Sequence, residues 1–187
     1  MRNDALETAK GSGDVLEIFV SGQCNERITV GRDRVTIEGD GTAVINGGFR
    51  VFSNNNVILR NLTITGPFPG LVATGGASVS VFEVVFDGND SFANMVLRRN
   101  AAVWLRNSQI IGDCESIYDE ECADGVVVDN SSLVLARSSI SNARYGITTD
   151  AGARVILEDW QGDNSKVFNN SVVGIQVAFK SLVDLRG

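Results

Sequence analysis

The fold is decided by the stretch Asn56-Val-Ile-Leu-Arg-Asn-Leu-Thr-Ile-Thr-Gly66, which is followed by Gly70-Leu-Val-Ala-Thr-Gly-Gly-Ala-Ser-Val79. Val57 and Leu59 are separated by one residue, which places both side chains on the same face of an extended strand. Gly and Asn tolerate positive backbone φ angles, so the residues at the ends of these segments favour tight bends. A short strand between two bends is typical of one side of a solenoid coil.

The apolar pair recurs along the chain at intervals of about 22 residues, which is the behaviour of a repeat architecture. Its copies are Val35/Ile37, Val57/Leu59, Val79/Val81, Val103/Leu105, Leu133/Leu135, Val155/Leu157 and Val183/Leu185. Bend-forming residues stand at constant offsets from the pairs. One set follows each pair and comprises Gly66, Gly88, Gly112, Asn142 and Asn164. A second set precedes each pair and comprises Gly48, Gly70, Asn94, Gly146 and Gly174, with Asp124 as a departure. A third set, closer before each pair, comprises Asn54, Gly76, Asn100, Asn130 and Gly152, with Lys180 as a departure.

Three bends in each repeat predict three short strands in each coil, with alternate side chains pointing inward. One predicted inward stack consists of Phe49, Leu71, Met95, Ile147 and Ile175. The sequence therefore predicts an all-β parallel β-helix of about seven to eight coils with a triangular cross-section. The alternative, an antiparallel sandwich, predicts hairpin turns and no constant offset between bends.

The two quoted segments resemble the repeats of the right-handed, single-stranded parallel β-helices of the pectate-lyase-like superfamily. The resemblance covers residues 14–187 and implies one β-helix domain over the whole chain, 1–187. It implies no single activity, because the superfamily includes polysaccharide lyases, hydrolases and epimerases, and also phage tailspikes and adhesins. The Gly-His-Gly, Asn-Thr-Asp and Arg-Ile-Lys motifs of the polygalacturonase-like members are absent, so no catalytic residue is assigned.

The composition excludes several functional classes. The chain of 187 residues is 43% hydrophobic, carries a net charge of −7 and contains no His. It has no basic excess to hold a nucleic acid, and no apolar run of about 18 residues to span a membrane. The absence of His excludes a Ser-His-Asp triad and a His-ligated metal.

The two ends of the chain differ. Residues 1–13 predict a short capping helix, because Asn3 or Asp4 can cap its N-terminus and Gly11 can end it. At the other end, residues 181–187 begin a coil without completing it, so we expect this coil to be truncated or covered by another chain. Nothing at the N-terminus resembles a signal peptide.

The longest insertion is bracketed by Cys114 and Cys122, which are spaced to close a small loop by a disulfide, while Cys24 is left over. A disulfide favours a secreted, periplasmic or cell-surface location. The alternative is three reduced cysteines.

The differences in repeat length fall between the first and second sets of bends, so the long loops are expected along one edge. Insertions on one face of a solenoid often form its binding face. The binding candidates there are Asp113, Glu115, Tyr118, Asp119, Glu120, Glu121 and Asp124, with Arg144 and Tyr145 one coil later. Two interpretations stay open: oxygen ligands for Ca²⁺, or a solvated acidic loop whose charge Arg144 neutralises. The spacing matches no calcium loop, so no cofactor is assigned.

One sheet supplies further candidates at its outward positions. Arg60 and Arg106 occupy equivalent places in their coils with Phe82 between them, and this set can hold an acidic sugar or form a solvated face. An apolar stripe lies beside them and comprises Ile58, Trp104, Val134 and Ile156. Such a stripe indicates an interface with a second copy, a partner or a glycan, and the alternative is ordinary tolerance of β-forming residues on an exposed sheet.

Two functions from different classes follow. The first is a carbohydrate-associated or interaction scaffold, secreted or at a surface, without a recognisable catalytic motif. The second is a polysaccharide lyase-like enzyme that acts on acidic glycans through Arg or Tyr and carboxylates. The expected partners are an acidic polysaccharide and a second copy, bound through the apolar stripe or the open C-terminal coil.

Overall fold

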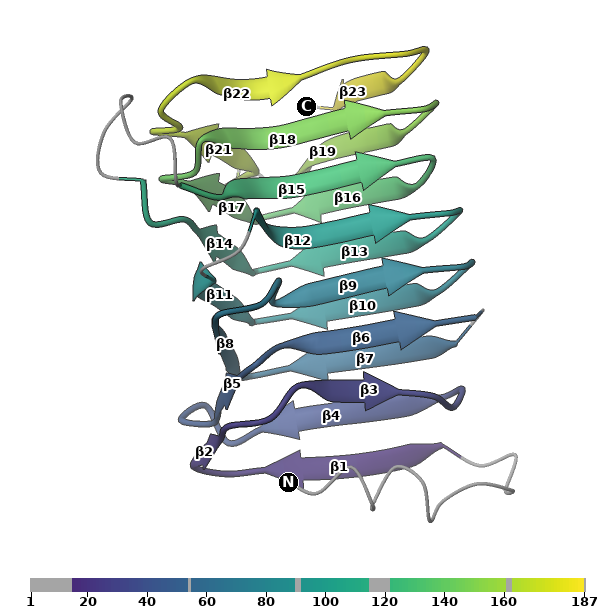
Figure 1. Cartoon of the computed structure of the whole chain (residues 1–187), viewed down its shortest axis with the longest axis vertical. Helices are drawn as coiled ribbons and strands as arrows, with labels where there is room; N and C mark the ends of the chain where they lie inside the picture. Colours follow the sequence, from purple (N-terminus) through teal and green to yellow (C-terminus); the bar gives the residue numbers. More distant parts are fainter. Residues whose placement is uncertain (1–14, 54, 90–91, 115–121, 161–162, 187) are drawn as a thin grey trace.

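The protein is a parallel β-helix, a stack of coils built from short strands (Figure 1). The computed structural model describes residues 15–53, 55–89, 92–114, 122–160 and 163–186. None of these residues is helical. The predicted capping helix falls on residues 1–13, outside the described residues.

Within the described residues, the strands form three sheets, one along each side of the stack. Sheet A holds β1 (Leu16–Val20), β4 (Val35–Gly39), β7 (Asn56–Arg60), β10 (Ser78–Phe82), β13 (Ala102–Arg106), β16 (Ser132–Ala136), β19 (Arg154–Trp160), β20 (Asp163–Asn164) and β23 (Leu182–Arg186). Every pairing in sheet A is parallel except that of β20, which runs antiparallel to the end of β19.

Sheets B and C complete each coil. Sheet B holds β2 (Gln23–Cys24), β5 (Val44–Asn46), β8 (Thr63–Gly66), β11 (Val85–Asn89), β14 (Gln109–Ile111), β17 (Ser139–Ser141) and β21 (Lys166–Phe168). Sheet C holds β3 (Ile28–Val30), β6 (Phe49–Phe52), β9 (Leu71–Thr74), β12 (Ala93–Arg98), β15 (Asp124–Asp129), β18 (Tyr145–Asp150) and β22 (Val173–Gln176). The chain thus runs from sheet A to B to C in each coil, and Figure 1 shows sheet C in front with sheet A behind it.

The core consists of side chains stacked in columns along the axis. Parallel register places Val57 beside Val79 and Leu59 beside Val81, so each predicted apolar pair joins the same two columns. The predicted inward stack on sheet C is also confirmed, with Val126 between Met95 and Ile147. These core residues are fully buried in the coils up to Val155, whereas Leu185 in the last coil is 71% exposed. Burying such side chains is the main stabilising contribution to the fold.

The bends confirm the sequence prediction in part. Positive φ angles occur at Gly76, Asn100, Asn130 and Gly152 as predicted, and also at Lys180, which has a φ of 60°. The bend from sheet A to sheet B was missed, because it is formed by Asn61, Glu83, Asn107 and Arg137, with φ between 50° and 56°. Glu83 and Arg137 carry no signature of a left-handed conformation, so their residue types could not indicate a bend.

The second predicted set of bends is confirmed only in part, because Gly48 has a positive φ of 75° whereas Gly146 does not. A Cβ on Gly146 would meet the side chain of Val167 and would lie 2.5 Å from the carbonyl oxygen of Gly174. Gly146 is therefore needed for close approach between coils. The register also corrects the departure at Asp124: because Met95 pairs with Val126 and Val126 with Ile147, Gly125 fills this place in the set.

The extra residues are not all at one edge, contrary to the sequence prediction. The described residues that flank the longest insertion do lie between β14 of sheet B and β15 of sheet C. In the coil that begins with β19, however, the added residues form a hairpin between sheets A and B, where β20 pairs with Asp159 and Trp160. The number of residues between bends does not distinguish the corner between sheets A and B from the corner between sheets B and C. Asn164 has the offset expected for a bend between sheets B and C, although it belongs to the hairpin between sheets A and B.

Candidate functional site

The edge between sheets B and C carries the predicted acidic loop. Cys114 and Cys122 form a disulfide with a Cα–Cα distance of 5.2 Å, which confirms the predicted pair. The backbone N–H of Cys114 donates to Asn142 O at 2.9 Å, and that of Arg144 donates to Ala123 O at 2.9 Å, so both ends of the loop are tied to the next coil. The candidates Glu115, Tyr118, Asp119, Glu120 and Glu121 lie outside the described residues.

The structure brings Asp124, Arg144 and Tyr145 together beside this loop. The Thr148 hydroxyl donates to Asp124 Oδ2 at 3.4 Å, and the Arg144 guanidinium lies 5.4 Å from the centre of the Tyr145 ring. Burial raises the pKa of the Asp124 carboxyl above its ordinary value, against smaller opposing effects of Thr148 and Arg144. Asp113, also predicted, is exposed. Within the described part of the chain, no three acidic or cysteine side chains group as metal ligands, so the Ca²⁺ interpretation stays a prediction.

The sheet A candidates also come together. Arg60, Phe82 and Arg106 occupy the same outward column on adjacent strands. The Arg60 guanidinium lies 5.2 Å from the Phe82 ring centre, and Phe82 meets Trp104 edge to face at 5.7 Å. The row of Arg60, Phe82 and Trp104 therefore presents a cation and two aromatic rings on one face.

The apolar stripe is shorter than predicted. Ile58, Trp104 and Val134 are partly exposed and stack on adjacent strands, with Ser80 between the first two. Ile156 is only 7% exposed, so its assignment to an exposed stripe is wrong. Alternation places a side chain outside the sheet, but it does not reveal what packs there; β19 continues from Ile156 into the hairpin. That the shorter stripe forms an interface stays a prediction, which the solution mass of a Trp104→Ser variant can test.

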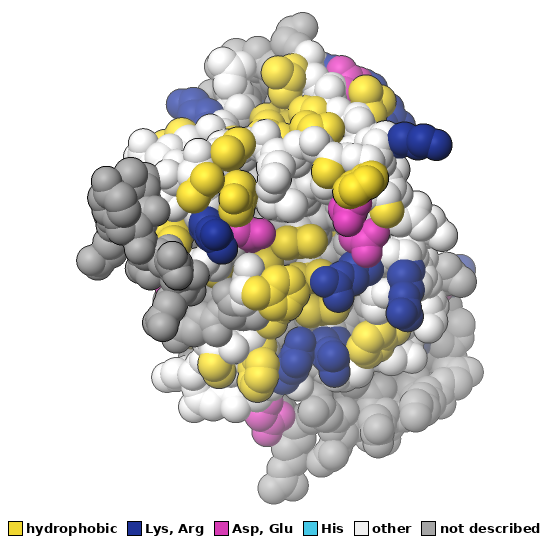
Figure 2. All heavy atoms as spheres, turned by 45° about the horizontal axis from the view of Figure 1, so that its top comes forward, with side chains coloured by type: hydrophobic (Ala, Val, Ile, Leu, Met, Phe, Trp, Pro, Cys, Tyr) yellow, Lys and Arg dark blue, Asp and Glu magenta, His cyan; other side chains and the backbone are white. Residues whose placement is uncertain are grey.

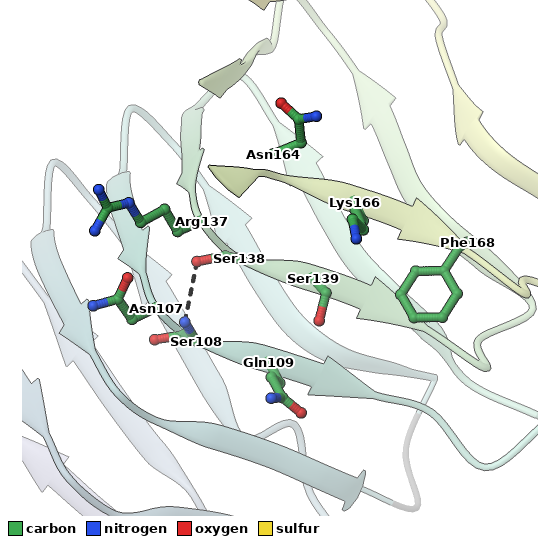
Figure 3. Close-up of a pocket in the computed structure, with 9 residues that line it drawn as sticks. All are labelled: Asn107, Ser108, Gln109, Arg137, Ser138, Ser139, Asn164, Lys166 and Phe168. Atoms are coloured by element: carbon green, nitrogen blue, oxygen red, sulfur yellow. Dashed lines mark hydrogen bonds between the residues drawn. The ribbon is translucent and has the colours of Figure 1, made fainter. Parts of the chain in front are cut away.

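A groove of about 610 Å³ lies on the outer side of sheet B, at its corner with sheet A. Gln109, Ser139 and Lys166 are paired across β14, β17 and β21, and they form one column along the groove. The remaining lining residues are Asn107, Ser108, Arg137, Ser138, Asn164 and Phe168 (Figure 3). The Phe168 ring closes one end and the corner residues line the opposite side.

The hairpin between sheets A and B, which the repeat pattern does not predict, helps to build this groove. Asn164 belongs to β20, and Lys166 and Phe168 belong to the strand that follows it. Below them, buried serines fix the corner: the backbone N–H of Ser108 donates to Ser138 Oγ at 3.2 Å, and that of Ser138 donates to Ser165 Oγ at 3.4 Å. The groove therefore rests on a corner held by hydrogen bonds between coils.

The lining of the groove differs in charge from the rest of the molecule. Arg137 and Lys166 contribute two positive charges, and none of the described residues that line the groove is Asp or Glu. The chain as a whole has a net charge of −7, so this positive lining is a local feature. The other polar side chains are amides and hydroxyls, which both donate and accept hydrogen bonds.

The sequence contains a signal for the bend between sheets A and B that is held by Ser108 and Ser138. At the place where earlier coils have the buried residues Leu62 and Val84, later coils have Ser108 and Ser138. A polar residue at an inward position requires a hydrogen-bond partner, which identifies a specialised corner. The groove itself had no such signal, because it depends on the placement of the hairpin.

Comparison of the chain with protein-family models, with curated proteins and with solved structures finds no match in any of the three. The described residues include no helix of the length and apolarity required to cross a bilayer.

Proposed function

We propose that the protein is a non-catalytic β-helix that binds an acidic oligosaccharide in the groove over β14, β17 and β21. The observation that carries this proposal is the set of lining residues that the structure describes: two cations, amides and hydroxyls, with no carboxylate among them. A sugar ring exposes hydroxyl groups that need both donors and acceptors, and Gln109, Ser139 and Asn107 supply both. Arg137 and Lys166 would pair with the acidic groups of the ligand.

The Phe168 ring supports a saccharide more than a free inorganic anion. It is 44% exposed, so an apolar ring face is available at the end of the groove. Sugar rings have an apolar face of C–H groups that packs on aromatic rings. A ligand that combines such a face with negative charge and hydroxyls matches the whole lining.

Binding is proposed rather than hydrolysis because glycoside hydrolysis requires two carboxyl groups flanking the scissile bond. Among the lining residues in the described ranges, none carries a carboxyl group. Membership of the pectate-lyase-like superfamily, and a secreted or surface location, belong to the same proposal. The Cys114–Cys122 disulfide supports this location, since such bonds persist in oxidising compartments.

The experiment is isothermal titration calorimetry with an oligogalacturonate hexamer, using the neutral maltohexaose as a comparison. We expect the acidic hexamer to bind, its affinity to fall with added salt, and Lys166→Gln and Arg137→Gln to weaken it at least tenfold. The control is Lys180→Gln, which removes the same charge from another corner of the stack. Equal affinity for both hexamers, or full affinity in both groove variants, would contradict the proposal.

A second candidate is a lyase-like activity at the edge between sheets B and C. The observation that favours it is the cluster of Asp124, Arg144 and Tyr145, where a carboxyl with a raised pKa lies near an arginine and a phenol. If this candidate is correct, incubation with polygalacturonate, with or without Ca²⁺, yields new unsaturated chain ends. These ends are detected by their ultraviolet absorbance. This activity would be lost in Tyr145→Phe and Arg144→Gln, whereas the groove proposal expects no new ends.

A further inference from the structure

Two arginines meet at the corner between sheets B and C in the first two coils. Arg27 directly precedes β3, and Arg50 is an outward residue of β6. Because Ile28 pairs with Phe49 and Thr29 with Arg50, the two arginines are diagonal neighbours on adjacent strands. Cα atoms of diagonal neighbours are about 7–8 Å apart, which two long side chains can easily bridge.

The Arg27 side chain is held in a defined position. Its guanidinium lies 4.8 Å from the centre of the Phe68 ring, which belongs to the loop before β9. A Cβ on Gly47 would lie 2.8 Å from the backbone N of Arg27, so the neighbouring coil passes close behind it. The backbone of Arg27 is thus packed against the next coil, and its partly buried side chain lies against an aromatic ring.

The Nε–H of Arg27 is buried and has no hydrogen-bond partner in the described structure. Buried polar groups almost always have a partner in the protein or an ordered molecule beside it. An unsatisfied N–H on a cation is particularly unfavourable, because burial removes water from a group that needs it. The position therefore lacks an acceptor.

The charges around Arg27 and Arg50 also indicate that a negatively charged acceptor is lacking at this position. Arg50 lowers the pKa of Arg27 by repulsion, in addition to the larger effect of burial. Among the described residues, neither guanidinium has a carboxylate within ion-pair distance, although the protein has more acidic than basic residues. The aromatic contact of Arg50 is with Phe52, at 5.7 Å. Figure 2 shows several Lys and Arg side chains on the face that it presents, next to hydrophobic side chains and with some Asp and Glu among them.

We propose that Arg27 and Arg50 form a binding site for an oxyanion, a sulfate, phosphate or carboxylate group, beside the Phe68 ring. An oxyanion supplies the acceptor that Arg27 Nε lacks, and it neutralises two like charges that otherwise repel each other. Guanidinium groups bind such anions through two N–H groups at once. The site is on a different edge from the groove and does not depend on the groove binding a glycan.

The test is thermal unfolding of the whole chain in chloride, and in sulfate, phosphate or glucuronate at the same ionic strength. A ligand that binds only the folded state raises Tm, and a site about nine-tenths filled gives a rise of about 3–5 °C for a chain of this length. We expect this rise with at least one of the three anions, and the most effective anion identifies the preferred group. A Tm that is equal in all four solutions would overturn the proposal.

Variants distinguish a specific site from general salt effects. Arg50→Gln should abolish the anion-dependent rise and leave Tm in chloride unchanged or higher, because it removes the repulsion on Arg27. The control is Arg98→Gln, which removes an arginine 5.9 Å from the Phe92 ring on the same sheet and should keep the full rise. Should Arg27→Gln fold poorly, the Nε–H NMR signal of Arg27 in the wild-type chain gives a second readout. This signal must shift on titration with the effective anion, and a rise retained in Arg50→Gln would contradict the site.

Discussion

The backbone N–H of Ser108 donates a hydrogen bond of 3.2 Å to the Oγ of Ser138, which lies one coil further along the stack. The Ser138 hydroxyl in turn donates to Ala136 O at 3.0 Å, so it completes the bend of its own coil as well. Both serines are buried. The bend from sheet A to sheet B below the groove is therefore held by hydrogen bonds at a place where earlier coils use apolar packing.

Removal of the Ser138 hydroxyl should destabilise the fold. In Ser138→Ala the N–H of Ser108 is left buried without its acceptor, which costs about 1–3 kcal/mol. Urea unfolding measures this change. The control is Ser139→Ala, whose half-exposed side chain lines the groove and should change stability by less than about 0.5 kcal/mol. Equal loss of stability in both variants would contradict the role of the buried hydroxyl.

A methyl group at Gly146 should disrupt the contact between two coils. Its Cβ would lie 2.7 Å from Asn170 Nδ2 and 2.5 Å from Gly174 O, and the backbone oxygen cannot move aside without shifting a strand. Gly146→Ala is expected to destabilise the protein by about 1–3 kcal/mol, as overpacking does. Gly31→Ala is the comparison, because a Cβ there meets nothing within 4 Å and the φ angle is not positive. Denaturant unfolding that ranks the two variants equally would refute this explanation.

The disulfide should contribute stability by restricting the loop in the unfolded chain. For a loop of this length, the chain-entropy relation gives about 2–3 kcal/mol. We expect a reducing agent to lower the free energy of unfolding of the wild-type chain by this amount. The double variant Cys114→Ser/Cys122→Ser isolates the effect, since a reducing agent should not change its stability further. A large further loss would indicate that Cys24 also takes part in a redox-sensitive contact.

The raised pKa of Asp124 predicts a pH dependence. Because burial raises this pKa in the folded state, the folded chain retains a proton at pH values where the unfolded chain has released it. The stability contributed by Asp124 is therefore fully present below the ordinary carboxyl pKa, and it is lost as pH rises through the raised value. The Asp124→Asn variant has no such loss.

Unfolding of wild type and Asp124→Asn should be compared from about pH 3 to pH 7, a range that brackets carboxyl titration. The variant should gain stability relative to wild type as pH increases. The lowered pKa values of Asp33 and Asp40 contribute the opposite dependence, but they act equally in both chains and cancel in the difference. A difference that stays constant with pH would show that Asp124 titrates alike in both states.

The columns of the core could be predicted from sequence because they repeat. Val57 and Val79 occupy equivalent places in successive coils, and parallel register requires such residues to stack. The bends were only partly predictable, because Gly and Asn indicate positive φ but the neighbouring coil can impose it on other residues. Arg137 adopts a φ of 50° although its side chain disfavours this conformation.

The candidate groove could not be predicted, for a topological reason. The long interval between Val155 and the next apolar pair shows that this coil contains extra residues. It does not indicate at which corner of the coil they are inserted. The pairing of Asp163 with Trp160 determines this, and it depends on contacts that no local pattern encodes. The paired candidates Arg60 and Phe82 were predictable, since they follow from register alone.

The most direct test of acidic-glycan binding in the groove is NMR mapping of the backbone amides of the whole chain during titration with an oligogalacturonate hexamer. We expect the largest shifts at Gln109, Ser139 and Lys166, the column along the groove. We also expect Lys166→Gln to reduce these shifts and maltohexaose not to produce them. Shifts confined to another face of the stack, or no shifts at millimolar hexamer, would contradict binding in the groove.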